Sequence, residues 1–206
     1  MRDAFAGRGI RRTDLRLNPA APHLGDRLWQ ATFSVDGGRR AGAAGDGLLL
    51  SRTQPRDPGQ ALHEVQVPIV EAYLASLPDG VPPRILASRT AVVVDAGRLD
   101  EAWRGAEDGV RRLTRTFLKR NADGDLRGLA RQTDTHLGTV DQVIASLAAD
   151  ETLARATDVA FQVHSVDPAH EITLRSIELL AAEVAPALGL RTGAEAAEEL
   201  RALGTV

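Results

Sequence analysis

Apolar runs alternate with helical segments along this chain. Four short apolar runs have the length and composition of buried strands, at residues 28–33, 48–50, 85–94 and 159–164. Between them, apolar residues recur every three or four positions, which predicts helices, the clearest from Leu99 to Phe117. Strands that alternate with helices are joined by right-handed crossovers and form a parallel sheet. The pattern therefore predicts an α/β fold with a parallel sheet.

The number of predicted strands indicates part of a barrel. A parallel (β/α) barrel of TIM type needs eight such units and typically about 250 residues. The chain has 206 residues and four predicted strands, so we expect it to hold about half of one barrel. We place the half barrel at residues 17–190, after a mobile N-terminal segment at residues 1–16 and before a C-terminal tail helix at residues 191–206.

Local signals predict where several helices begin and end. The small residues at 39–44 favour a helix that lies close against the sheet, and Pro68 is expected to kink or restart the next helix. Thr139 with Gln142 forms a capping box at the start of another helix. Asp167 is expected to cap the last helix, with Pro168 at its first position. Residues 120–136 read as a polar excursion.

Composition excludes several classes of function. The net charge of −3 and pI near 6.0 provide no basic surface for nucleic acid. The chain has no cysteine and its five histidines are scattered, which gives no support to a metal site or a thiol nucleophile. No apolar run reaches the roughly 18 residues of a membrane span. A cytoplasmic location fits this composition.

The end of the first predicted strand carries the strongest candidate site. Thr32, Phe33 and Ser34 are followed by Gly37 and then by a helix. Hydroxyls, free backbone N–H groups and the positive end of a helix together form a phosphate cradle. The alternative is that Ser34 only caps the helix and that Gly37 is only a turn residue.

Two further residues follow predicted strands, where barrel enzymes place their chemistry. Arg52 follows the 48–50 strand and is a candidate to meet a phosphate or an anionic substrate, the alternative being a solvated loop arginine. His164 ends the last predicted strand and is a candidate for the vicinity of a bound cofactor or substrate, the alternative being a histidine that is satisfied by a structural hydrogen bond. Asp46, between two glycines, reads as a turn former.

Three blocks in order resemble the luciferase-like flavin-dependent monooxygenases. Residues 27–52 (RLWQATFSVDGGRRAGAAGDGLLLSR) resemble the middle of that family, and residues 136–150 resemble its Gly-Thr-Pro helix start, with Val140 in place of the proline. Residues 172–188 (ITLRSIELLAAEVAPAL) resemble its closing helix. The likeness covers about Leu17 to Gly189 and corresponds to the family's C-terminal half, so the chain would hold about the last four β/α units.

The resemblance implies a cofactor and a choice of functions. It implies that reduced FMN, supplied by a separate flavin reductase, binds with its phosphate at the turn of Thr32, Phe33, Ser34 and Gly37, and that a small organic substrate is oxidised with O2. Catalytic residues would belong to the family's N-terminal half and are not assigned here. Two alternatives stay open: a deazaflavin-dependent reductase on the same fold, and a truncated or split-gene half barrel that binds flavin or a partner chain without catalysis.

A half barrel also predicts a partner. The 28–33 and 159–164 strands would each lack one neighbour, and their unpaired N–H and C=O groups invite pairing with another chain. We therefore expect either a homodimer or pairing with a complementing N-terminal half.

Overall fold

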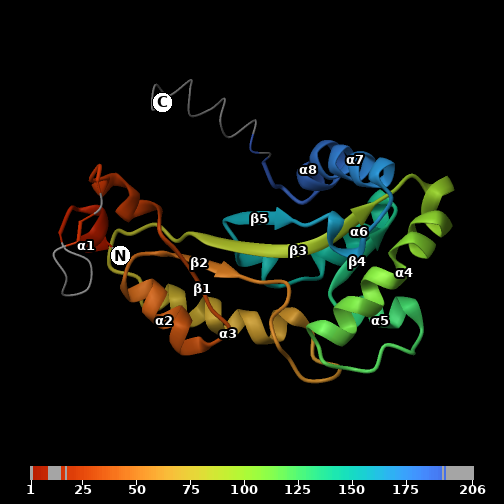
Figure 1. Cartoon of the computed structure of the whole chain (residues 1–206), viewed down its shortest axis with the longest axis horizontal. Helices are drawn as coiled ribbons and strands as arrows, with labels where there is room; N and C mark the ends of the chain where they lie inside the picture. The colour runs from red at the N-terminus through yellow and green to blue at the C-terminus, as the bar shows by residue number, and fades with distance from the viewer. Residues whose placement is uncertain (1, 9–14, 17, 192, 194–206) are drawn as a thin grey trace.

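The structure, a computed structural model, describes residues 2–8, 15, 16, 18–191 and 193, which form a parallel sheet flanked by helices (Figure 1). Every strand pair is parallel, as predicted. The strands are β1 (Trp29–Ala31), β2 (Gly47–Leu50), β3 (Ile85–Val93), β4 (Thr135–Gly138) and β5 (Asp158–Phe161).

The long strand β3 organises the sheet. Its first residues pair with β2, which in turn pairs with β1, and its residues 86–89 pair with β5. Its last four residues, Thr90 to Val93, pair with β4. The polar excursion expected at residues 120–136 is wrong, because it contains helix α5 (Leu126–Gln132) and the beginning of β4. The sheet therefore has five strands rather than four among the described residues.

Helices connect the strands and cover much of the sheet. The α-helices other than α5 and the irregular helices occupy the following ranges: α1 (Arg2–Phe5), α2 (Val35–Ala43), α3 (Leu62–Leu74), α4 (Leu99–Thr116), α6 (Val140–Ala148), α7 (His170–Leu179) and α8 (Ala185–Ala187), with 3-10 turns η1 (Pro22–Arg27), η2 (Ala96–Arg98), η3 (Leu153–Arg155) and η4 (His164–Val166) and the π-helical segment η5 (Leu180–Val184). Figure 1 shows α2 and α3 along β1 and β2, and α7 and α8 beside β5.

The two faces of the sheet differ in how completely helices cover them. Residues that are paired across neighbouring strands point to the same face of the sheet, whereas successive residues along one strand point to opposite faces. Leu48 and Ile85 are paired and pack with Ile69 and Tyr73 of α3, so this face is closed by helices. On the opposite face, here called the inner face, the apolar side chains are only partly covered: Trp29, Ala31, Leu49, Leu86 and Ala160 are half-buried or exposed.

Glycines allow α2 to lie directly against α3. A side chain at Gly38 would come within 2.5 Å of the carbonyl oxygen of Ile69, and one at Gly42 within 2.3 Å of the carbonyl oxygen of Tyr73. Replacing either glycine therefore requires the two helices to move apart. The expectation for residues 39–44 is borne out at Ala41, which packs with Leu48 and Leu50 of the sheet, while Gly38 and Gly42 serve the contact between the helices.

Three local predictions at the C-terminal end are wrong. The last strand stops at Phe161, so His164 begins the turn η4 instead of ending a strand. Asp167 is not a helix cap, because its backbone is left-handed (φ 51°) and its carboxylate pairs with Arg112 at 2.6 Å. The helix α7 starts at His170, and Ala169 is its N-cap. The capping box of Thr139 is confirmed, since Gln142 accepts the N–H of Thr139.

Pro68 neither stops nor restarts its helix. Helix α3 runs without interruption from Leu62 to Leu74, with Pro68 inside it. The neighbours Ile69 and Val70 are fully buried, and this packing offsets the loss of a backbone donor at the proline.

Barrel closure stays a prediction. Among the described residues, β1 pairs only with β2 and β5 pairs only with β3, so the sheet is open at both of these strands. The N-terminal segment at 1–16 is described only for 2–8, 15 and 16, where α1 is tied back by the N–H of Ala21 to the carbonyl of Phe5. The tail helix predicted at 191–206 lies outside the described residues, apart from Arg191 and Gly193.

Candidate functional site

The turn after β1 brings together three of the predicted residues. Ser34 is the N-cap of α2, and its Oγ accepts the N–H of Gly37 at 3.1 Å. The Oγ1 of Thr32 accepts the N–H of Ser34 at 3.2 Å. A side chain at Gly37 would overlap Thr32 Oγ1, at 1.8 Å, so only glycine fits this turn as it is folded. Thr32, Ser34 and Gly37 therefore form one closed structure at the N-terminus of α2.

The same turn exposes groups that could bind a ligand. Phe33, between the two hydroxyl residues, is 54% exposed. The first N–H groups of α2, from Val35 and Asp36, point along the positive end of the helix dipole. Asp36 adds a negative charge there, but its carboxylate is paired with Arg39. The turn thus offers N–H and O–H donors in an arrangement suited to a phosphate group.

Arg52 stands at the end of the neighbouring strand. Its Nε donates to Gln162 Oε1 at 2.9 Å, and its guanidinium lies 5.9 Å from the centre of the Phe117 ring. Half-burial lowers the pKa of the Arg52 guanidinium, yet arginine remains cationic at neutral pH. A half-buried cation with one side-chain hydrogen bond keeps donors for an anionic group.

Gln162 connects Arg52 to Ser88 and Ser165, a set of contacts that the sequence did not predict. These four residues are called the Gln162 row. The Nε2 of Gln162 donates to Ser88 Oγ at 3.3 Å, and its Oε1 also accepts from Ser165 at 3.3 Å. Arg52 follows β2 and Gln162 follows β5, while Ser88 lies within β3 between them, so the ends of β2 and β5 meet beside β3. In open α/β sheets and barrels, ligands bind at this edge of the sheet.

His164 is not part of this row. It is exposed, and its carbonyl accepts the N–H of Asp167 within the turn η4. Its place in the vicinity of a flavin or substrate stays a prediction. Asp46 lies in the turn before β2 as expected, and its carboxylate accepts from Gln30 at 2.7 Å.

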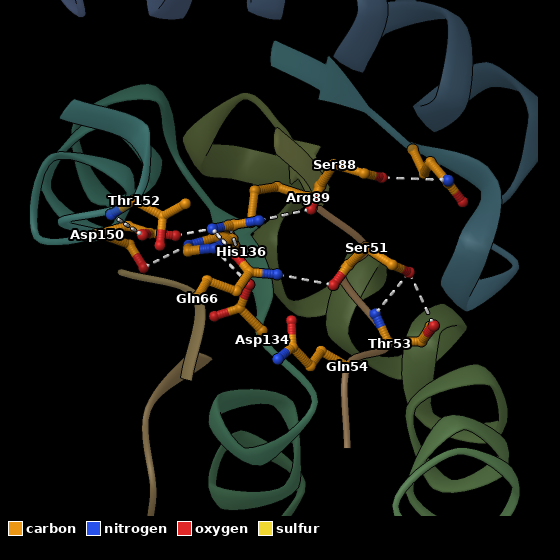
Figure 2. Close-up of polar contacts among 12 residues, drawn as sticks. Ser51, Thr53, Gln54, Gln66, Ser88, Arg89, Asp134, His136, Asp150 and Thr152 are labelled. Atoms are coloured by element: carbon orange, nitrogen blue, oxygen red, sulfur yellow. Dashed lines mark hydrogen bonds and ion pairs between the residues drawn. The ribbon is translucent and has the colours of Figure 1, made fainter. Parts of the chain in front are cut away.

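A buried charged network centres on Arg89 (Figure 2). Arg89, in the middle of β3, is fully buried. Its Nε donates to Asp150 at 2.5 Å, its Nη1 to the carbonyl of Ser88 and its Nη2 to Gln66 at 2.8 Å. Gln66 in turn donates to the carbonyl of Ser51 at 2.9 Å. The network therefore ties β3, α3 and the end of β2 together beneath Arg52.

A second carboxylate approaches the same arginine. Asp134, in a left-handed backbone conformation, lies 3.5 Å from Arg89 Nε and 3.6 Å from His136 Nε2. Burial by itself would raise the pKa of Asp134, but His136, Arg89 and Arg56 outweigh burial and hold the pKa below its ordinary value. At 3.6 Å the contact with His136 is electrostatic rather than a hydrogen bond, while His136 Nδ1 is 2.7 Å from Ser146 Oγ.

One signal in the sequence could have revealed this network. Arg89 interrupts an apolar strand, ILASRTAVV, and a charged residue within a buried strand requires a partner. The partners themselves could not be found, because Gln66, Asp134 and Asp150 lie on other elements.

The described residues show neither a metal cluster nor a membrane span. No group of three or more histidine, aspartate or glutamate side chains there could hold a metal ion. No described helix is long and apolar enough to cross a membrane.

Comparison with known proteins identifies a shared fold. No protein-family model matches the sequence, and no curated protein matches it. The monooxygenase RslO1 from Streptomyces bottropensis has a similar structure (TM-score 0.60, 21% identity, 90% of this chain and 57% of that one). MsnO8 in its apo form is also similar (TM-score 0.54, 18% identity, 91% of this chain and 57% of that one).

A third structure is similar over less of the chain. It is the FMN complex of the oxygenating constituent of 3,6-diketocamphane monooxygenase from Pseudomonas putida, a type II Baeyer-Villiger monooxygenase (TM-score 0.44, 20% identity, 80% of this chain and 49% of that one). This similarity lies below the level that establishes a common fold.

The likeness to the first two structures establishes the fold. The chain shares its fold with these proteins. It spans 57% of the length of each of them. At 18% and 21% identity, the likeness concerns the fold alone.

Proposed function

We propose that this chain is the C-terminal part of a luciferase-like, FMN-dependent monooxygenase barrel. It would contribute to the oxidation of a small organic substrate by O2. Three sequence blocks that resemble that family, and that occur in the same order, support the proposal. The fold that the chain shares with the monooxygenase RslO1 also supports it. The activity itself would belong to a complete barrel.

The observation that carries the proposal is the turn from Thr32 to Gly37. It combines two hydroxyls, the N-terminus of α2 and a glycine that leaves no space for a side chain. Arg52 follows the adjacent strand and supplies a positive charge at the same edge of the sheet. These donors match the charge and hydrogen-bonding needs of a phosphate monoester, so the residues present fit the FMN phosphate.

In this proposal the protein binds and orients the cofactor. Ser34, Thr32 and the first N–H groups of α2 would hold the phosphate, and Arg52 would balance its charge. Gln162 would keep the Arg52 side chain in place through its hydrogen bond. When bound, reduced FMN supplies the chemistry that activates O2, and a separate flavin reductase would supply the reduced cofactor.

Flavin binding is the most direct test. The purified chain is titrated with FMN and followed by quenching of flavin fluorescence, and we expect saturable binding. Riboflavin, which has the same ring system without the phosphate, should bind more weakly because it does not reach the turn or Arg52. Equal affinities for FMN and riboflavin would contradict a phosphate site here. A deazaflavin cofactor titrated in parallel tests the reductase alternative.

A further inference from the structure

The open edges of the sheet indicate how the barrel closes. A continuous path crosses the sheet from β1 through β2 and β3 to β5, and both of its end strands have one free edge among the described residues. The path contains four parallel strands, so two copies supply the eight strands of a TIM-type barrel. The strand β4 pairs only with the far half of β3 and lies off this path.

We propose that two copies of this chain close one barrel, with β5 of each copy pairing in parallel with β1 of the other. A twofold axis then runs along the barrel, and both copies use the same two edges. The partly exposed apolar side chains of the inner face, including Trp29, Leu49 and Leu86, become the barrel interior.

The register of the strand pairs predicts which residues meet. Ala31, Leu49, Leu86 and Asp158 form one row across the sheet. Because strands of such a barrel are tilted to the right, a full circuit steps back by about eight residues toward the N-terminus, and half a circuit by about four. The residue of the partner that faces Asp158 is therefore Arg27, the last residue of η1, which lies four positions before Ala31 and two before the start of β1.

The charges at this junction are complementary. Arg27 and Asp158 are both exposed in the single chain. The side chain of Asp158 accepts a hydrogen bond from its sequence neighbour Thr157. Pairing would place opposite charges together at the start of both junctions, which favours this register over others.

Space for the partner lies beside β5. A groove of about 630 Å³ runs between β5 and the helical segments α7, η5 and α8, and its apolar lining includes Val159, Phe161, Ile177 and Leu180. Ile177 is 51% exposed there. The partner's first strand and the helix that covers it would fill this groove.

Closure would also complete the flavin site. The partner's Ser34 turn follows its β1 and would come next to Gln162, at the end of β5. Each phosphate turn would then be flanked by Arg52 of its own chain and by the Gln162 row of the other. This last step rests on the proposed function, whereas the pairing of strands does not.

Cysteine cross-linking tests the register, since the chain has no cysteine of its own. The same register places Leu28 opposite the partner's Val159, and the double variant L28C/V159C should form a covalent dimer on oxidation, without added flavin. The single variants L28C and V159C are the controls. In the twofold barrel, equivalent residues lie on opposite sides, so neither single variant should cross-link efficiently.

Charge reversal provides an independent measurement in solution. R27D and D158R should each weaken the dimer at least about tenfold by analytical ultracentrifugation, and R27D/D158R should restore it. A wild-type monomer at micromolar concentration, or a dimer that neither cross-links at these positions nor responds to the reversal, would overturn the proposal. A covalent dimer that binds no FMN would support the assembly and reject only the flavin site.

Discussion

Two arginines near the same edge of the sheet behave in opposite ways. Arg89 is fully buried and donates to Asp150, Gln66 and the carbonyl of Ser88. Arg52 is half-buried and donates to Gln162, with Phe117 beside its guanidinium. The first has its donors engaged within the protein, while the second retains donors for a ligand.

The comparison shows why charge alone does not identify a binding residue. A buried cation that is satisfied by its own chain holds elements together, as Arg89 does for β3, α3 and the end of β2. A partly exposed cation at a strand end can exchange water for an anion. The following predictions test this division between support and binding, beginning with the largest effect.

Replacement of Arg89 should cause the largest loss of stability. Arg89→Met would leave Asp150 and Asp134 buried without their cation, at a cost of about 3–5 kcal/mol in the free energy of unfolding. Urea unfolding measures the change, and Arg39→Ala is the control, because its ion pair with Asp36 lies on the surface. A loss no greater than that of the control would show that Arg89 does not support the fold.

Replacement of Arg52 should act on the ligand instead. We expect Arg52→Ala to weaken FMN binding by about 1.5–3 kcal/mol, because a charge-assisted hydrogen bond to the phosphate is lost. Riboflavin binding should change less, and the unfolding midpoint should stay near that of the wild type. Equal losses for the two flavins would indicate damage to the fold and remove Arg52 from the phosphate site.

Ser34 allows the roles of helix cap and phosphate ligand to be separated. Ser34→Ala should weaken FMN binding by roughly 1–3 kcal/mol and also destabilise α2 by about 1 kcal/mol through loss of the cap. Ser34→Asp keeps an N-cap acceptor for Gly37 but repels a phosphate. We therefore expect near-normal stability with weak FMN binding in Ser34→Asp. Unchanged FMN affinity in that variant would assign Ser34 to capping alone.

Asp134 should make the stability of the protein fall as the pH becomes acid. Its folded-state pKa lies below the ordinary value of the unfolded chain, so its carboxylate stabilises the protein above the unfolded pKa. This stability is lost as the pH falls through the folded pKa. Thermal melts from pH 6 to pH 3 should decline less steeply in Asp134→Asn than in the wild type. Parallel curves for the two proteins would show that the carboxylate contributes nothing through its charge.

Much of the candidate site could be predicted from local signals. Thr32, Ser34 and Gly37 lie within one turn, and a hydroxyl before a helix has a strong local tendency to cap it. The relation of Arg52 to Gln162 could not be predicted, because these residues are 110 positions apart and meet only where β2 and β5 flank β3. His164 was placed wrongly since the apolar pattern continues past Phe161, while the chain turns there.

The sequence by itself determined the parallel α/β arrangement, most strand positions and the capped turn after β1. Hydrophobic periodicity and capping act over a few neighbouring residues, so they can be read directly from the chain. Tertiary structure alone decided the partners of Arg89, the strand β4 and the role of Gly38 and Gly42 against α3. These features depend on contacts between distant segments, and only packing selects which buried polar groups meet and how closely two helices approach.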